Sequence, residues 1–289
     1  MRFYNFCTLA FVALAIAGCA AVQRKDATTE ELRRLDDLAD VLKLDLGKVE
    51  RKGADKNMVG IRSQHVLFSK RLDSRTYFIQ DDRYQPDNGK GVFQGSDEEL
   101  IRLSQQVMGE LAIPMDEIGK SVVITENLLT ARYDTESKKY VPGQVRDGKR
   151  FVEVSRVVKD VPVFSSRALI GLSQDKSVGF LEVHWPQFPE TTLQEAQRLQ
   201  EIVQSGWRPP YQRGALVESM EAGIIHSPAL GFAMDVYPVI RVIYAPEDKT
   251  IGRKAVLYLD EKGESVPVPR TFEKSDQPLT EQRKESYRK

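Results

Sequence analysis

Cysteine is almost absent from this 289-residue sequence, and both of its cysteines, Cys7 and Cys19, lie within the first twenty residues. An excess of one charge is also absent, because 42 Lys and Arg residues balance 42 Asp and Glu residues. This balance disfavours a dedicated nucleic-acid-binding protein. With 41% apolar and 29% charged residues, the composition is that of an ordinary globular protein. It excludes a collagen, a disordered acidic tail and a multi-spanning membrane protein.

The N-terminus has the pattern of an export signal. Arg2 gives a positive start, and an apolar run extends from Phe6 to Ala17. The run is about a dozen residues, shorter than the ~20 that a transmembrane helix needs. Small residues follow it, as in a secretory signal peptide. The segment Ile16-Ala17-Gly18-Cys19 resembles the lipobox of bacterial lipoproteins.

The lipoprotein resemblance implies removal of residues 1–18, a diacylglycerol on the Cys19 thiol and an acyl chain (palmitate or similar) on the new N-terminus. The protein would then be exported and anchored in a bacterial membrane. Ala20, in place of an Asp, favours the outer membrane, facing the periplasm or the cell surface, over the inner membrane. Cys7 leaves with the signal, so no cysteine remains for an internal disulfide or a catalytic thiol.

The mature chain is predicted to have four parts. Residues 19–57 are a lipidated, polar spacer with a short helix that begins with a Thr28–Glu31 capping box. Residues 58–188 and 189–270 each combine a helix with β-strands, and residues 271–289 form a polar tail. The predicted fold class is therefore α+β, with two units that each pack an antiparallel sheet on a helix. Whether the units are a true repeat stays open.

Local patterns place the elements of these two units. Ser96 and Glu99 form a capping box before a helical apolar repeat that ends at Pro114, and a second helix begins near Thr192 and stops at Gly206. Strands are predicted at Ser121–Glu126 and Leu128–Tyr133, and a polar loop is predicted to run on to Gly148. Three strands between Arg150 and Trp185 predict an antiparallel meander.

Residues 148–185 carry a second resemblance. A strand begins at Arg150-Phe151-Val152, and Asp160-Val161-Pro162-Val163-Phe164-Ser165-Ser166 leads into the next strand. This segment is similar to the propeptide module of thermolysin- and fungalysin-type metalloproteases and to PepSY-like modules, with Asp160 and Ser165 in place of two glycines. The resemblance implies a cystatin-like fold and a binding or inhibitory role. It does not imply peptidase activity, because no metalloprotease domain follows.

Motifs of catalysis and cofactor binding are not found. The sequence has no H-E-x-x-H, no G-x-S-x-G and no P-loop spacing. Glu182 and His184 would share one face of a strand, but a metal ion would need a further ligand. We therefore predict no catalytic residue, no metal and no cofactor. His226, before Ser227-Pro228, is the residue most open to a role as general base or recognition group.

The leading interpretation is a non-enzymatic envelope lipoprotein, inhibitor-like or chaperone-like, that binds a protein or peptide partner and no nucleic acid. An exposed sheet edge can accept such a partner by main-chain pairing. One alternative is an envelope hydrolase that uses His226 or His184 with a carboxylate. Another is a carrier with a small apolar ligand between helix and sheet. The candidate partner-binding residues are histidine, aromatic and proline positions: Pro162, Phe164, His184, Trp185, Trp207, His226 and Tyr237.

Overall fold

The computed structural model of the protein describes residues 29–266, apart from residues 56, 73, 88, 229–233 and 248–253. The predicted signal peptide, the Cys19 anchor and the C-terminal tail lie outside these residues. The described chain starts with a helix over 29–41. The strands that follow are β1 (Val49–Asp55), β2 (Met58–Ser63), β3 (Val66–Arg71), β4 (Thr76–Asp81), β5 (Ile118–Asp134), β6 (Lys139–Val158), β7 (Val161–Leu172), β8 (Val178–His184), β9 (Ala215–Pro228), β10 (Met234–Pro246) and β11 (Ala255–Leu259). The other helices are α2 (Asp97–Glu110), the short 3₁₀ helix η1 (Met115–Glu117) and α3 (Glu190–Gln204).

The eleven strands of the described residues belong to one sheet that branches at β7. One branch has the order β1-β2-β3-β4-β8-β7-β6-β5 and is antiparallel throughout. The other branch is the antiparallel set β9-β10-β11. A single parallel bridge between Val163 of β7 and Ile224 of β9 joins the two. Gly223 permits this approach, because a Cβ atom there would lie 2.4 Å from the carbonyl oxygen of Pro162.

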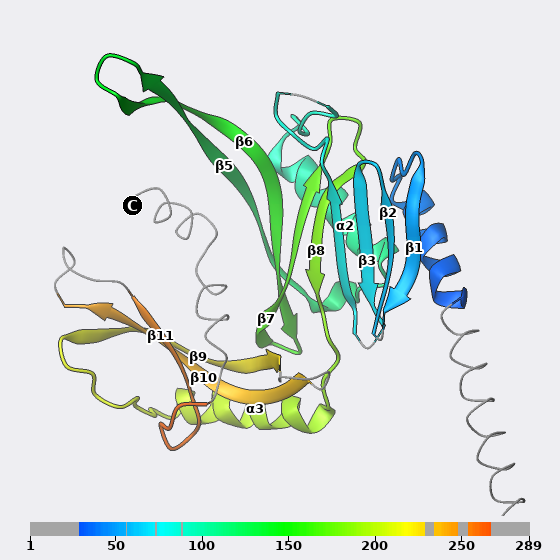
Figure 1. Ribbon diagram of the computed structural model, residues 1–289. Helices are drawn as coiled ribbons and strands as arrows, with labels where there is room; N and C mark the ends of the chain where they lie inside the picture. Colours follow the sequence, from blue (N-terminus) through cyan, green and yellow to red (C-terminus); the bar gives the residue numbers. More distant parts are fainter. Residues whose placement is uncertain are drawn as a thin grey trace, which may run out of the picture.

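Helices cover one face of each branch (Figure 1). Leu35 of the first helix and Leu100 and Met108 of α2 pack against buried strand residues such as Phe68 and Leu181. Leu193 and Ala196 of α3 lie in a cluster with Val163 and Ile224, where the branches meet. None of the described helices is long and apolar enough to cross a membrane.

The predicted fold class is wrong. The structure is mostly sheet, and its strands form one large mixed sheet rather than cystatin-like units built on a helix. The meander of β6, β7 and β8 is present, but β8 also pairs with β4, which places strands from the start of the chain in the same sheet. The start of β7 also bridges to β9, and this bridge joins the β9–β11 branch to the rest of the sheet. The prediction failed because the sequence pattern shows pairing between neighbouring strands and not pairing between distant ones.

The three helix predictions are confirmed: the helix over 29–41 lies in the predicted spacer, and α2 and α3 follow the other two signals. Ser96 is the N-cap of α2, and its side chain accepts a hydrogen bond from the backbone N–H of Glu99. Helix α3 starts two residues before Thr192, directly after Pro189. Gly206, just beyond its end, has a φ of +98°, a conformation that favours glycine.

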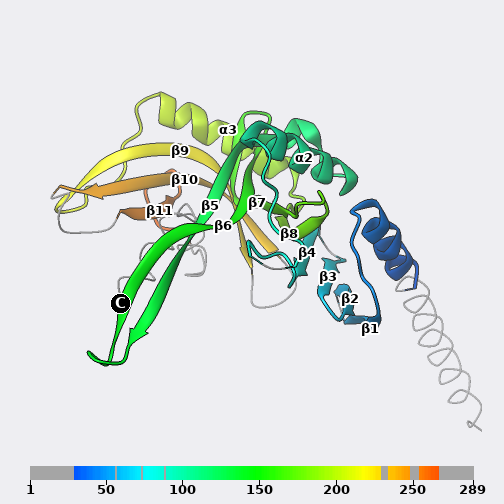
Figure 2. The same ribbon diagram turned by 90° about the horizontal axis from the view of Figure 1, so that it is seen from above.

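The hairpin of β5 and β6 extends beyond the rest of the molecule. Residues 127–147 pair only with each other, because β6 meets β7 from Val152 onward. We call residues 127–147 the arm. Figures 1 and 2 show from two directions that the arm points away from both branches. The predicted polar loop up to Gly148 is therefore wrong, because most of it is the outer part of β6.

Candidate functional site

One face of the arm is apolar and exposed. Strand alternation and the β5–β6 register place Leu129, Ala131 and Tyr133 of β5 on the same side as Tyr140 and Val145 of β6. We call these five residues the arm face. Tyr140 is 73% exposed and Val145 is 64% exposed. Large side chains this exposed on neighbouring strands are typical of an interaction surface.

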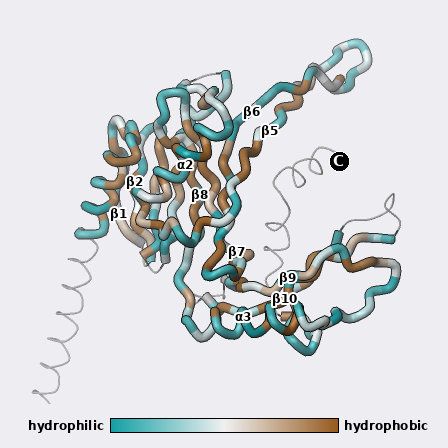
Figure 3. Tube along the Cα trace, turned by 180° about the vertical axis from the view of Figure 1, so that it is seen from behind, coloured by the Kyte–Doolittle hydropathy of each residue, from teal (hydrophilic) through white to brown (hydrophobic). Residues whose placement is uncertain are grey.

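The arm face has some internal order, but no described residue covers it. The rings of Tyr133 and Tyr140 meet edge to face with centroids 5.3 Å apart. Figure 3 shows apolar positions continuing from the sheet into the arm. A two-stranded hairpin is only marginally stable in water. A bound partner would therefore stabilise the arm as well as cover its apolar side chains.

The opposite side of the arm differs in character. Lys139, Val141 and Arg146 alternate with the arm-face residues of β6, so they point to the other side. Arg146 forms an ion pair with Asp87, at 2.6 Å, in the loop after β4. Val141 is 45% exposed on this side. It provides a matched control for Val145, because both valines are exposed and lie on the same strand.

A second group of polar residues lies buried where the two branches meet. Arg156 of β6 is 4% exposed and donates to the Glu117 carboxylate at 2.8 Å. Trp185 donates its indole N–H to the same carboxylate oxygen, also at 2.8 Å. The Arg156 guanidinium lies 5.0 Å from the ring centre of Phe188 and 5.3 Å from that of Trp185. We call Glu117, Arg156, Ser165, His184, Trp185 and His226 the junction cluster.

The structure brings together two histidines that are far apart in the sequence. The rings of His184 and His226 lie edge to face with centroids 6.1 Å apart. Burial lowers the pKa of His184 to about 4 and the pKa of His226 to about 3, and the positive charge of Arg156 adds to both shifts. Both imidazoles are therefore neutral at pH 7.

The contacts of His226 bear on the hydrolase alternative. Its Nδ1 lies 2.9 Å from the Ser165 hydroxyl, which also accepts the His226 backbone N–H at 2.7 Å. Its Nε2 is buried and has no hydrogen-bond partner among the described residues. Ser165 is itself buried. The part of the chain that the structure describes therefore gives this serine–histidine pair no carboxylate and no exposed nucleophile.

His184 and Glu182 do share a strand face, as alternation predicts. His184 Nδ1 lies 3.3 Å from the Thr76 hydroxyl on β4. The Glu182 carboxylate lies 3.8 Å from Arg167 on β7. Among the described residues there is no group of three His, Cys, Asp or Glu side chains that could hold a metal ion.

The remaining predicted partner-binding residues are spread over the β7–β11 region. Phe164 packs under the Arg241 guanidinium at 4.1 Å and, with Tyr237, against the Ile225 cluster. Trp207 follows α3 and donates its indole N–H to the Glu261 carbonyl. Pro162 is half-buried beside Gly223. Together with buried Trp185 and His226, these residues mostly serve packing in the described chain, and their role in binding stays a prediction.

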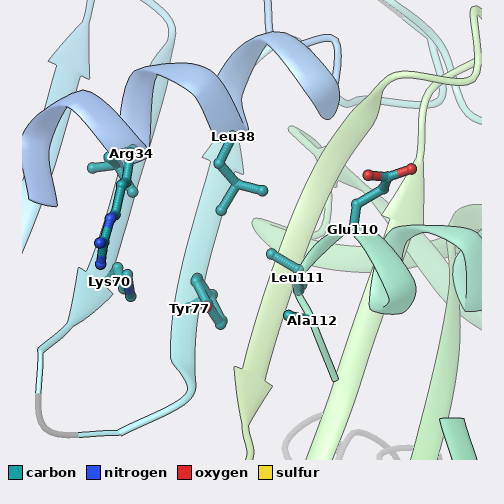
Figure 4. Close-up of a pocket in the computed structure, with 8 residues that line it drawn as sticks. Arg34, Leu38, Lys70, Tyr77, Glu110, Leu111 and Ala112 are labelled. Carbon is teal, nitrogen blue, oxygen red and sulfur yellow. The ribbon is translucent and has the colours of Figure 1, made fainter. Parts of the chain in front are cut away.

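A small pocket lies between the first helix and the C-terminal end of α2 (Figure 4). Its volume is about 150 Å³, below the roughly 300–1,000 Å³ of most small-molecule sites. Leu38, Tyr77 and Leu111 line its apolar part, whereas Lys70 and Glu110 add charge. Lys70 is paired with Glu31 at 2.8 Å. This pocket therefore differs from the apolar cavity that the carrier alternative requires.

Known proteins provide little further information. No protein-family model and no curated protein matches the chain. An uncharacterized protein from Eubacterium rectale is similar in structure, with 15% identity over 81% of this chain and 80% of that one and a TM-score of 0.45. The Bacillus megaterium YpeB C-terminal domain covers 79% of this chain and 92% of its own, with 8% identity and a TM-score of 0.33. TM-scores below 0.5 do not establish a common fold.

Proposed function

We propose that this protein is an exported lipoprotein, anchored by acyl chains on Cys19, that binds a protein or peptide partner of the bacterial envelope through its arm face. The proposal of partner binding rests on the exposed apolar face of a hairpin that extends from the body. The proposal of membrane anchoring rests on the lipobox resemblance. The role is non-enzymatic, since in the described residues the Ser165–His226 pair is buried and has no carboxylate, and the Glu117 carboxylate is bonded to Arg156 and Trp185.

The arm face suits a polypeptide better than a small ligand. Its five residues lie on two neighbouring strands and form a surface without an enclosing wall. Partners of such surfaces bury exposed aromatic side chains, and Tyr residues commonly supply much of the binding energy. Tyr133 and Tyr140 lie at the tip, where a partner reaches them first.

Removal of the anchor is the first test. A Cys19→Ala variant is expected to lose acyl label and to leave the membrane fraction, because two or three acyl chains supply stable anchoring at ~0.8 kcal/mol per buried CH₂. Radiolabelled palmitate and membrane flotation measure both effects. A Cys7→Ala variant is the control and keeps label and location. Full membrane retention of Cys19→Ala would show that the lipobox interpretation is wrong.

The second test compares the two sides of the arm. With the full chain as bait in envelope extracts, Val145→Ser is expected to lower recovery of a stoichiometric partner about tenfold, because burial of a valine contributes about 1.5–3 kcal/mol. Val141→Ser, on the opposite side of β6, should leave recovery within about twofold. Equal effects of the two substitutions, or no stoichiometric partner for the unmodified chain, would refute binding through the arm face.

A further inference from the structure

We propose that two copies of this chain pair through their β5 edges, antiparallel about a two-fold axis at Asn127. The pairing would place the arm of each copy along residues 120–127 of β5 in the other copy, in a four-stranded sheet with the order β6-β5-β5-β6. This inference goes beyond the proposed function and holds whether or not a further partner binds the arm face. It rests on the free edge of β5 and on the charges along it.

The β5 edge is long and regular. In the described chain β5 pairs with β6 alone, so its other edge carries unpaired N–H and C=O groups along Ile118–Asp134. From Ser121 onward, the extra residues at the two register shifts lie on β6, so β5 itself has no bulge there. Its sequence has no proline. Natural proteins commonly protect an edge strand with bulges, prolines or a cover, because a bare edge pairs with another strand.

The side chains along β5 are accessible to a second copy. Val122 is 41% exposed near the start of the strand, and Leu129 and Tyr133 are 43% and 49% exposed further out. Lys120 is exposed as well. No described residue forms an ion pair with Lys120.

Charge complementarity selects the register. With the axis at Asn127, Tyr133 of each copy lies opposite Ser121 of the other, and Asp134 then lies next to Lys120, which is in the irregular stretch between Ile118 and Ser121. Asp134 is held as a carboxylate by hydrogen bonds from the Ser137 hydroxyl and the Glu136 backbone N–H. An axis at Glu126 would place two copies of Glu126 opposite each other, and like charges in that position are destabilising.

Apolar complementarity agrees with this register. Ala131 lies opposite Val123, and Leu129 lies opposite Thr125, on the side of the sheet that carries the arm face. A two-fold axis perpendicular to the sheet keeps equivalent faces on the same side. The two arm faces would therefore lie on the same side of the joined sheet, at opposite ends of the paired β5 strands.

A charge exchange tests the pairing in the full chain, solubilised in detergent and measured by sedimentation. Lys120→Glu and Asp134→Lys, each alone, are expected to weaken dimerisation roughly tenfold, because each replaces two ion pairs by two repulsive contacts. Asp134→Asn, which keeps an acceptor for the turn, should weaken it less. The double variant Lys120→Glu/Asp134→Lys should dimerise like the unmodified chain. The proposal would be overturned if the unmodified chain is monomeric, or if the double variant dimerises no more tightly than the single variants.

A disulfide trap tests the register independently. In a full chain whose Cys7 and Cys19 are replaced by Ala, Asn127→Cys is expected to form a covalent dimer on mild oxidation. Opposed Cα atoms in antiparallel strands are about 4.5–5.5 Å apart, within the roughly 4.4–6.8 Å that a disulfide spans. Val141→Cys, on β6, should stay monomeric. Efficient cross-linking through Val141→Cys but not Asn127→Cys would show association through another surface and contradict the β5 pairing.

Discussion

Replacement of Glu117 by Ala is expected to lower the free energy of unfolding by about 3–5 kcal/mol, because it leaves a buried charge without its partner. Arg156 is 4% exposed, and its guanidinium donates to the Glu117 carboxylate and to the Pro186 carbonyl oxygen. The substitution also removes the acceptor of the Trp185 indole N–H. Urea unfolding followed by tryptophan fluorescence measures the loss.

The matched control is Glu182→Ala. Its carboxylate also pairs with an arginine, Arg167, but the distance is 3.8 Å and the Glu182 side chain is 44% exposed. Exposed ion pairs contribute about 0–1 kcal/mol, so this control should change stability by no more than that. A second control, Glu117→Leu combined with Arg156→Met, removes both charges and should recover much of the loss. If Glu117→Ala costs no more than Glu182→Ala, the buried Arg156 does not depend on Glu117 as its partner.

Acid is expected to destabilise the protein well above the pH at which carboxylates titrate. The folded-state pKa values of His184 and His226, about 4 and about 3, lie below the value of 6.5 for an unperturbed histidine. The unfolded chain therefore binds more protons, and stability falls as the pH falls. The stability that the two neutral histidines contribute is fully present above pH 6.5. It is lost as the pH falls from 6.5 toward their folded-state pKa values. By pH 5 the loss is about 2 kcal/mol for each histidine.

The pH dependence of urea unfolding between pH 7.5 and 5 measures this effect. A His184→Gln/His226→Asn double variant should show a much flatter profile over the same range, because neither side chain titrates. His65→Gln is the control, because His65 is exposed and lies 3.0 Å from Asp82 on the surface. A double variant that keeps the full acid sensitivity would show that other groups cause it.

Local structure was largely predictable where one side of an element is buried. The capping box at Ser96 and the apolar repeat through Leu100 led to α2, and alternating valines led to β6. The same rule explains the failure at β1, which lies in the segment predicted as a polar spacer with a short helix. β1 is an edge strand whose described side chains are mostly exposed, so it has no buried alternation. Without a buried face, a strand leaves no period of two in the sequence.

The predicted strand Leu128–Tyr133 is part of β5, but the β6 half of the arm escaped prediction for the same physical reason. Residues 134–149 are polar, and Pro142 and the two nearby glycines are typical of a loop. Because neither side of the arm packs on a core, its alternation of Tyr140, Pro142 and charged residues carries no strong signal. The exposed tyrosines on two facing strands were the available clue. Their importance depends on the pairing of Tyr133 with Tyr140, which the sequence alone did not establish.

The junction cluster shows how far the sequence alone can predict which residues come together in a site. His184 and His226 were both selected from the sequence, but forty residues and a helix separate them. Their contact arises because β7 pairs with β8 at one end and meets β9 at the other. Arg156 and Glu117, which organise the cluster, were not selected. A lone arginine in an alternating strand has no pattern that marks it as buried.

The most direct test of the account is site-specific photo-cross-linking in intact cells. A photoreactive amino acid at position 140 or 145, on the arm face, is expected to give an adduct with one envelope protein. The same group at position 141, on the opposite side of β6, should give no such adduct. Equal adducts from both sides, or an adduct at position 141 alone, would contradict binding through the arm face.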